Sequence, residues 1–234
     1  MATYLVTGAN RGIGFEYCKQ LLARGDQVIA VCRQSSPELY SLGKSHNRLK
    51  IETGIDVSDD RAIATLTQSL QNQSIDVLIN NAGIYRPSTL NSLDVEGIRE
   101  QFEINAIAPL KFTQALLPKL NTNQPATPAG IAKVAIMTSR MGSIDDNTSG
   151  SAYGYRMSKV AVSMAGKSLS HDLKCDGIAV AILHPGLVST GMTNFNPNGI
   201  SPAESVKGLL ARIDELSLDN TGTFWHSNGE ILPW

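Results

Sequence analysis

The segment TGANRGIG, residues Thr7 to Gly14, sets the expected fold. It follows the apolar run TYLVT and leads into a helix-like segment, so a glycine-rich turn joins a strand to a helix. Glycines let backbone N–H groups approach a ligand, and a helix start offers unpaired donors and partial positive charge. The turn therefore suits a nucleotide phosphate. Because the spacing is G-x-x-x-G-x-G and departs from the dinucleotide fingerprint G-x-G-x-x-G, a purely structural turn is the alternative.

Apolar runs alternate with helix-like segments along the rest of the chain. The strand-like runs are TYLVT, QVIAVC, LKIETGID, IDVLINN, AKVAIMTS and GIAVAILHP. The helix-like segments lie at 15–24, 61–71, 95–120 and 155–173. Near-continuous apolar strands between helices are typical of a parallel sheet that is buried on both faces. The pattern predicts an α/β fold, a doubly wound parallel sheet with helices on both faces.

Three irregular stretches separate these elements. Residues 121–130 join a helix to a strand, and residues 140–154 lie between the fifth strand and the last helix of the pattern. The second stretch leaves the carboxyl end of a strand, where ligands bind in parallel sheets. Residues 187–204 have the length and polarity of a lid over a cleft.

Length and composition favour one globular domain over residues 1–234, with 42% hydrophobic and 18% charged residues. A net charge of -1 and the absence of a basic run give no attraction for nucleic acid or for an anionic membrane. No apolar stretch approaches the ~18 residues of a membrane span, so we expect a soluble, cytoplasmic protein. Three cysteines without C-x-x-C spacing fit reduced thiols better than a disulfide framework or a metal site.

The end of the second strand-like run bears on the choice of nucleotide. A carboxylate that binds the ribose is expected about 20 residues beyond a phosphate loop. Here the chain reads VCRQ, with no carboxylate between Asp26 and Glu38. A guanidinium at Arg33, together with Arg11 in the loop, favours the 2'-phosphate of NADP over NAD. The alternative is two solvated surface arginines.

The segment YGYRMSK, residues 153 to 159, holds two tyrosines upstream of one lysine. On a helix Tyr155 and Lys159, at i and i+4, share a face, whereas Tyr153 has Met157 at that spacing. A nearby ammonium favours the phenolate, so this pair predicts a tyrosine whose pKa is lowered from ~10 towards neutrality. The alternative is a buried ring covered by the stem of a lysine.

Taken in order, six motifs resemble those of the short-chain dehydrogenase/reductase superfamily. They are TGANRGIG, NNAG at 80–83, Asn105 in EINAIAP, Ser139 in MTSRMG, YRMSK and HPGLVST at 184–190. The closing GTFWHSNGEILPW is similar to the C-factor and Sniffer-like carbonyl reductase branch. The resemblance implies a Rossmann fold and an NADP-dependent oxidoreductase.

The resemblance also implies roles for four residues. Tyr155 would be the general acid and base, Lys159 would lower its pKa and hold the nicotinamide ribose, and Asn105 would anchor a water that links the lysine to solvent. Ser139 would hydrogen-bond the substrate oxygen. Ser143 lies closer to Tyr155 in sequence and stays open as the donor, although Ser139 begins the S-x-x-G pattern of the family.

The expected cofactor-binding residues lie in six parts of the chain. They are Gly8, Asn10, Arg11, Gly12, Ile13, Gly14, Arg33, Asp56, Val57, Asn81, Ala82, Gly83, Tyr155, Lys159, Pro185, Gly186, Val188 and Thr190. Two alternatives remain: Asp56 could be a helix cap, and Asn105 could hydrogen-bond within its own helix. No metal is expected, because neither His171 nor His184 has partners at ligand spacing.

The expected activity is NADPH-dependent reduction of a small ketone or aldehyde to an alcohol. The alternative is a dinucleotide-binding sensor or signalling protein with little turnover, for which a poised phenol would have no use. The sequence does not identify the substrate. By the family resemblance we expect a homodimer or homotetramer.

Overall fold

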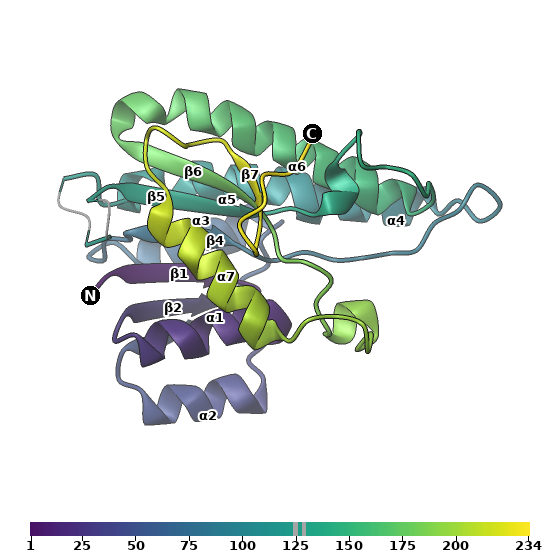
Figure 1. The fold of residues 1–234 in the computed structure, drawn as a ribbon. Coiled ribbons are helices and arrows are strands. Elements are labelled where there is room, and N and C mark those ends of the chain that lie inside the picture. Colours follow the sequence, from purple (N-terminus) through teal and green to yellow (C-terminus); the bar gives the residue numbers. More distant parts are fainter. Residues whose placement is uncertain (124–125, 128–129) are drawn as a thin grey trace.

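The computed structural model describes residues 1–123, 126–127 and 130–234, so the predicted loop at 121–130 falls partly outside the described residues. In this part of the chain seven parallel strands form one sheet in the order β3-β2-β1-β4-β5-β6-β7 (Figure 1). The strands are β1 (Thr3–Thr7), β2 (Gln27–Val31), β3 (Leu49–Glu52), β4 (Val77–Asn80), β5 (Ala132–Met137), β6 (Ile178–His184) and β7 (Phe224–His226).

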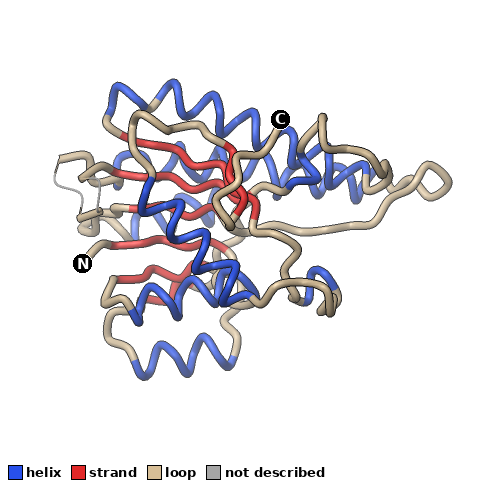
Figure 2. Tube along the Cα trace, in the orientation of Figure 1, coloured by secondary structure: helices blue, strands red, loops and turns tan. Residues whose placement is uncertain are grey.

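Helices cover both faces of this sheet (Figure 2). They are α1 (Gly12–Ala23), α2 (Pro37–Ser45), α3 (Asp60–Ser69), α4 (Val95–Phe102), α5 (Ala108–Leu116), α6 (Tyr153–Asp172) and α7 (Pro202–Glu215). One apolar core lies between the sheet and α1, α2 and α7, and a second lies between the sheet and α3, α5 and α6. The predicted doubly wound α/β fold is confirmed.

The near-continuous apolar strands have a direct structural cause. In β1 the side chains of Tyr4 and Val6 enter the first core, and that of Leu5 enters the second. Successive side chains of a strand point to opposite faces. Since both faces are covered, every position from Tyr4 to Thr7 is buried.

The order of the strands places a cleft beside the end of β1. From β1 the chain builds outward through β2 and β3, and then returns to the other side of β1 with β4. Loops that leave β1 and β4 therefore diverge at the carboxyl edge of the sheet, and in open α/β sheets ligands bind at such a switch point. The motifs TGANRGIG and NNAG come from these two neighbouring strand ends.

Some elements differ from the sequence-based expectation. The helix predicted over 95–120 is four pieces: α4, a π-helical turn η1 (Glu103–Ile107), α5 and a 3₁₀ turn η2 (Leu117–Lys119). Helices α2 and α7 and strand β7 were not predicted. In the stretch predicted as a lid, 187–204, the chain is irregular apart from the 3₁₀ turn η5 (Gly191–Thr193), until Ser201 caps α7 and Pro202 begins it.

A lysine fixes α7 to the sheet. Lys133 in β5 is fully buried, and its Nζ donates hydrogen bonds to the carbonyl oxygens of Ile213 at 2.6 Å and Asp214 at 3.0 Å. Carbonyls in the last turn of a helix have no partner within the helix, so the ammonium supplies one. Burial lowers the pKa of Lys133 to about 8.

Replacement of Lys133 should change how stability depends on pH. Between pH 8 and the ordinary lysine pKa of ~10.4, Lys133 is protonated in the unfolded chain and largely neutral in the folded protein, so this residue makes stability rise with pH. Lys159 acts in the same sense. The Cys18 and Cys32 thiols, whose pKa values are raised by burial, act in the opposite sense. Lys133→Met should therefore show a smaller rise or a steeper fall of stability with pH than the parent. Urea unfolding at pH 7.5 to 10 measures how the free energy of unfolding changes with pH in both proteins.

The same variant should lose about 1–3 kcal/mol at pH 7.5 through the unpaired carbonyls. Lys207→Met, at an exposed position of α7, is the control and should match the parent. An unchanged pH slope in Lys133→Met would contradict this role of the buried ammonium.

Candidate active site

None of the three glycines of the glycine-rich turn can be replaced without strain. Gly8 has a φ of +65° and Gly12 a φ of +54°, both in the left-handed region. A Cβ on Gly14 would collide with the carbonyl oxygen of Gly8 and lie 2.7 Å from Nδ2 of Asn81. That amide donates a hydrogen bond of 2.9 Å to the carbonyl of Thr7, which joins the ends of β1 and β4. The Arg11 side chain does not cap α1, so the start of the helix keeps donors for an anion.

A cleft of about 990 Å³ opens beside this turn. The residues lining it that were predicted from the sequence are Gly8, Asn10, Arg11, Gly12, Ile13, Gly14, Arg33, Asp56, Val57, Asn81, Ala82, Gly83, Tyr155, Lys159, Pro185 and Thr190. Four predicted site residues do not line it: Asn105, Ser139, Gly186 and Val188. Ile55 and Thr138 also line the cleft and were not predicted, whereas Ser189, Met192 and Phe195 belong to the stretch predicted as a lid.

Arg33 and Asp56 face each other across one end of the cleft, with 3.7 Å between Nη1 and Oδ2. The Arg33 side chain is 68% exposed, so this pair is weak. Burial raises the pKa of Asp56, but hydrogen bonds from the Ser58 hydroxyl and backbone N–H and the charge of Arg33 outweigh it, and the pKa is lowered. The helix cap of α3 is Asp59, so Asp56 is not that cap.

Tyr155 and Lys159 lie on successive turns of α6, with Nζ 5.6 Å from the centroid of the tyrosine ring. The Lys159 ammonium donates a hydrogen bond of 2.9 Å to the carbonyl oxygen of Met137 at the end of β5. Ser139, two residues further along, lies close enough to the Tyr155 phenol to lower its pKa, whereas the Ser143 hydroxyl accepts from the backbone N–H of Asp146. The geometry thus pairs Ser139 with the phenol.

The pKa of the phenol shifts in the direction opposite to the one expected from the sequence. Burial raises the pKa of Tyr155 to about 12, against a smaller lowering by the Ser139 hydrogen bond. Burial also lowers the pKa of Lys159 to about 8. The ammonium therefore does not offset the desolvation of the phenolate, and the protein without a ligand holds a protonated phenol.

Asn105 occupies the π-helical turn η1, a kind of distortion that is frequent at functional sites. Its amide reaches Ile84 after β4: Oδ1 accepts from the backbone N–H at 2.8 Å, and Nδ2 donates to the carbonyl at 2.9 Å. Nδ2 also donates to the Ser158 hydroxyl on α6 at 3.1 Å. Asn105 thus connects β4 to α6 beyond its own helix, which rules out a purely local role.

The loop after β6 forms the opposite wall of the cleft. A Cβ on Gly12 would lie 3.5 Å from the Thr190 methyl group, so this loop lies against the glycine-rich turn. Val188 is buried and forms a parallel bridge with Ile200. Gly186 has a φ of +87°, which allows the loop to turn, and it packs near His226.

His184 at the end of β6 contacts His226 of β7 edge to face, with ring centroids 4.8 Å apart. Burial first, and then the charge of His226, lower the pKa of His184 to about 3. The ring stays neutral at physiological pH and acts as part of the packing beneath the cleft. Among the described residues, no group of three or more His, Cys, Asp or Glu side chains could hold a metal ion.

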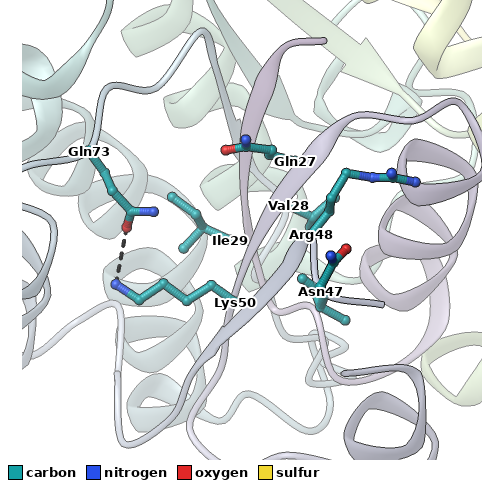
Figure 3. Close-up of a pocket in the computed structure, with 8 residues that line it drawn as sticks. Gln27, Val28, Ile29, Asn47, Arg48, Lys50 and Gln73 are labelled. Carbon is teal, nitrogen blue, oxygen red and sulfur yellow. Dashed lines mark hydrogen bonds between the residues drawn. The ribbon is translucent and has the colours of Figure 1, made fainter. Parts of the chain in front are cut away.

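A second cavity, of about 520 Å³, lies at the amino ends of β2 and β3 (Figure 3). Its lining is partly polar and partly apolar, with the Lys50 ammonium donating to the Gln73 amide oxygen at 3.0 Å. The lining residues are Gln27, Val28, Ile29, Asn47, Arg48, Leu49, Lys50 and Gln73. The lining holds no carboxylate, histidine, cysteine or hydroxyl, and the Lys50 ammonium is paired with Gln73 and with Glu52 at 2.8 Å, so this cavity offers no free group for general acid-base or nucleophilic chemistry.

Comparison with known proteins places the chain in a family. The model for short chain dehydrogenases matches residues 2–199, and the chain belongs to this family. It is 38% identical to 1-hydroxy-2-glutathionyl-2-methyl-3-butene dehydrogenase of Rhodococcus sp. (strain AD45), over the full length of both. It is 43% identical to the C-signal protein of Myxococcus xanthus, over 68% of this chain and 93% of that one.

A solved structure of a carbonyl reductase has the same fold as this chain. The NADPH-bound carbonyl reductase from chicken fatty liver superposes with a TM-score of 0.89 at 33% identity, over 100% of this chain and 99% of that one. The resemblance to the C-factor and Sniffer-like carbonyl reductase branch of the family is confirmed. No helix among the described residues is long and apolar enough to cross a membrane.

Gly14→Ala should destabilise the protein, because the new methyl group meets the Gly8 carbonyl and the Asn81 amide. We expect a loss of about 1–3 kcal/mol in the free energy of unfolding. Gly191→Ala, on another wall of the same cleft, is the control, since its Cβ would meet nothing closer than 3.9 Å. Equal stability of both variants in denaturant unfolding would contradict the tight turn.

Proposed function

We propose that this protein reduces a carbonyl group of a small molecule to an alcohol with NADPH, and that Tyr155 donates the proton. The observation that carries the proposal is that Tyr155 and Lys159, 5.6 Å apart from ring centroid to Nζ, line the same cleft as the glycine-rich turn. A proton donor and an anion-binding turn in one cleft are what hydride transfer from a dinucleotide to a carbonyl requires.

The residues of the cleft fit a dinucleotide phosphate. The backbone of the turn packs closely against Asn81, which is possible only because Gly14 has no Cβ. Helix α1 begins there without a side-chain cap. Arg33 at the end of β2 supports a preference for NADP, as does the NADPH bound in the carbonyl reductase from chicken fatty liver. When bound, the nicotinamide supplies the hydride. Asn81, Ala82 and Gly83, which line the cleft, would lie along the cofactor through their backbone.

The raised pKa of Tyr155 suits the direction of reduction. A carbonyl oxygen that gains negative charge becomes a strong base, comparable to hydroxide, whose conjugate acid has a pKa of about 15.7. A phenol with a pKa of about 12 is protonated at neutral pH and still acidic enough to give up its proton. Ser139, as a second donor to the same oxygen, would stabilise the developing charge.

Lys159 and Asn105 support the site from the side of the nicotinamide ribose. The Lys159 ammonium lies within reach of the Gly83 backbone, because a Cβ there would be 3.8 Å from Nζ. We assign to Lys159 the ribose hydroxyls and to Asn105 a water that links the lysine to solvent. Residues 187–204, with Met192 and Phe195 at the cleft, are assigned as the lid over the substrate.

The C-signal relative favours a second candidate function, a dinucleotide-binding signalling protein with little turnover. The two functions differ in their need for the phenol. A binding protein would tolerate loss of the Tyr155 hydroxyl, whereas an enzyme would not.

Tyr155→Phe should reduce kcat for a test ketone by about 100 to 10,000-fold, the usual contribution of a positioned general acid. The ring and its packing are retained, so the dissociation constant for NADPH should stay within about twofold of the parent. Steady-state kinetics and fluorescence titration measure the two quantities. Retained ketone reduction would remove Tyr155 as the donor, and absent turnover in the parent would favour the signalling function.

Arg33→Ala should weaken binding of NADPH by about tenfold, which corresponds to ~1.4 kcal/mol, and leave binding of NADH nearly unchanged. The reason is the loss of a guanidinium that would pair with the 2'-phosphate. Arg61→Ala, at an exposed position of α3, is the matched control. Parallel titrations with both nucleotides measure the ratio, and an equal effect on both would contradict the assignment.

A further inference from the structure

The segment that follows β4 is fixed by two buried amide side chains. The Asn105 amide holds Ile84 through both its N–H and its carbonyl. The Gln101 amide oxygen accepts the N–H of Arg86 at 2.9 Å, and Gln101 is fully buried. Tyr85 lies between these two anchors, so its backbone is held from both sides although its side chain is 40% exposed.

The same segment fixes the beginning of α6. The backbone N–H of Ala152 donates to the Ser88 carbonyl at 2.8 Å, and that of Gly154 donates to the Ser88 hydroxyl at 3.4 Å. Ser151 and Ala152 have φ values of 55° and 51°, a conformation that costs a residue with a Cβ about 1–3 kcal/mol. The start of α6 is thus held in a strained conformation by the segment that carries Tyr85.

The two tyrosines meet at this junction. The rings of Tyr85 and Tyr155 pack edge to face, with centroids 5.3 Å apart and an angle of 80° between their planes. This arrangement is a favoured one for aromatic pairs, worth about 0.5–1.5 kcal/mol beyond the area that it buries. On its own helix Tyr155 has Lys159 one turn away, but that ammonium is directed to the Met137 carbonyl.

We propose that Tyr85 is a positioning residue: its ring, held by the anchored backbone at 84–86, keeps the Tyr155 ring oriented with its hydroxyl towards Ser139. This inference rests on the proposed function, in which Tyr155 donates the proton. The required property is the flat ring of Tyr85, because the contact is between ring edges and faces. The Tyr85 hydroxyl is not needed.

Positioning matters because general acid catalysis depends on distance. A displacement of about 1 Å at a reacting group costs about 100-fold in rate. The energy of the ring contact is small against the stability of the whole fold, so its loss should change the orientation of Tyr155 without unfolding the protein.

Tyr85→Leu and Tyr85→Phe separate the ring from the hydroxyl. Tyr85→Leu should lower kcat for a test ketone by about 10 to 100-fold, with the KM for the ketone and the dissociation constant for NADPH within about threefold of the parent. Tyr85→Phe should restore kcat to within about twofold. Tyr40→Leu, an exposed tyrosine on α2, is the matched control and should behave as the parent.

Two outcomes would overturn the inference: a folded Tyr85→Leu variant that keeps the kcat of the parent, or a Tyr85→Phe variant as slow as Tyr85→Leu. A crystal structure of Tyr85→Leu gives a readout independent of turnover. We expect the Tyr155 ring to rotate or become disordered there, and an unmoved ring would also overturn the inference. Failure of the proposed function is distinguishable, because it would leave the parent and Tyr155→Phe with the same activity, whether both reduce the ketone or neither does.

Discussion

The close approach of the glycine-rich turn to the end of β4 is the constraint on which the rest of the site depends. Asn81 joins the ends of β1 and β4 at the point where the sheet reverses its direction of growth, and Gly14 has no space for a side chain there. A few residues after Asn81, the chain is held by Asn105 and Gln101 and passes Tyr155. One junction therefore fixes both the glycine-rich turn and the environment of the phenol.

The sequence predicted those features that depend on local patterns. The turn at Thr7 to Gly14, the parallel sheet and the pairing of Tyr155 with Lys159 rest on short spacings and on the periodicity of apolar residues, and the structure contains all three. Strand β7 has only three residues, too few for a periodic signal. The contact of Tyr85 with Tyr155 joins two segments about 70 residues apart, which no local pattern reveals.

The direction of the pKa shift of Tyr155 could not be predicted for a related reason. Sequence spacing shows that an ammonium is near, but the balance between its charge and the burial of both groups depends on tertiary packing. In the structure the Lys159 ammonium is directed to the Met137 carbonyl, and burial dominates at both residues. The result is a phenol that is kept protonated, as a general acid for carbonyl reduction must be.

The protonation state of Tyr155 shows whether burial or the Lys159 ammonium controls the phenol. In protein labelled with ¹³C at the tyrosine Cζ, the signal of Tyr155 is the one that Tyr155→Phe lacks, and its shift reports ionisation. Because burial raises the pKa of the phenol, we expect Tyr155 in the protein alone to be still protonated well above the ordinary tyrosine pKa of ~10. Ionisation at or below that pH would contradict this expectation.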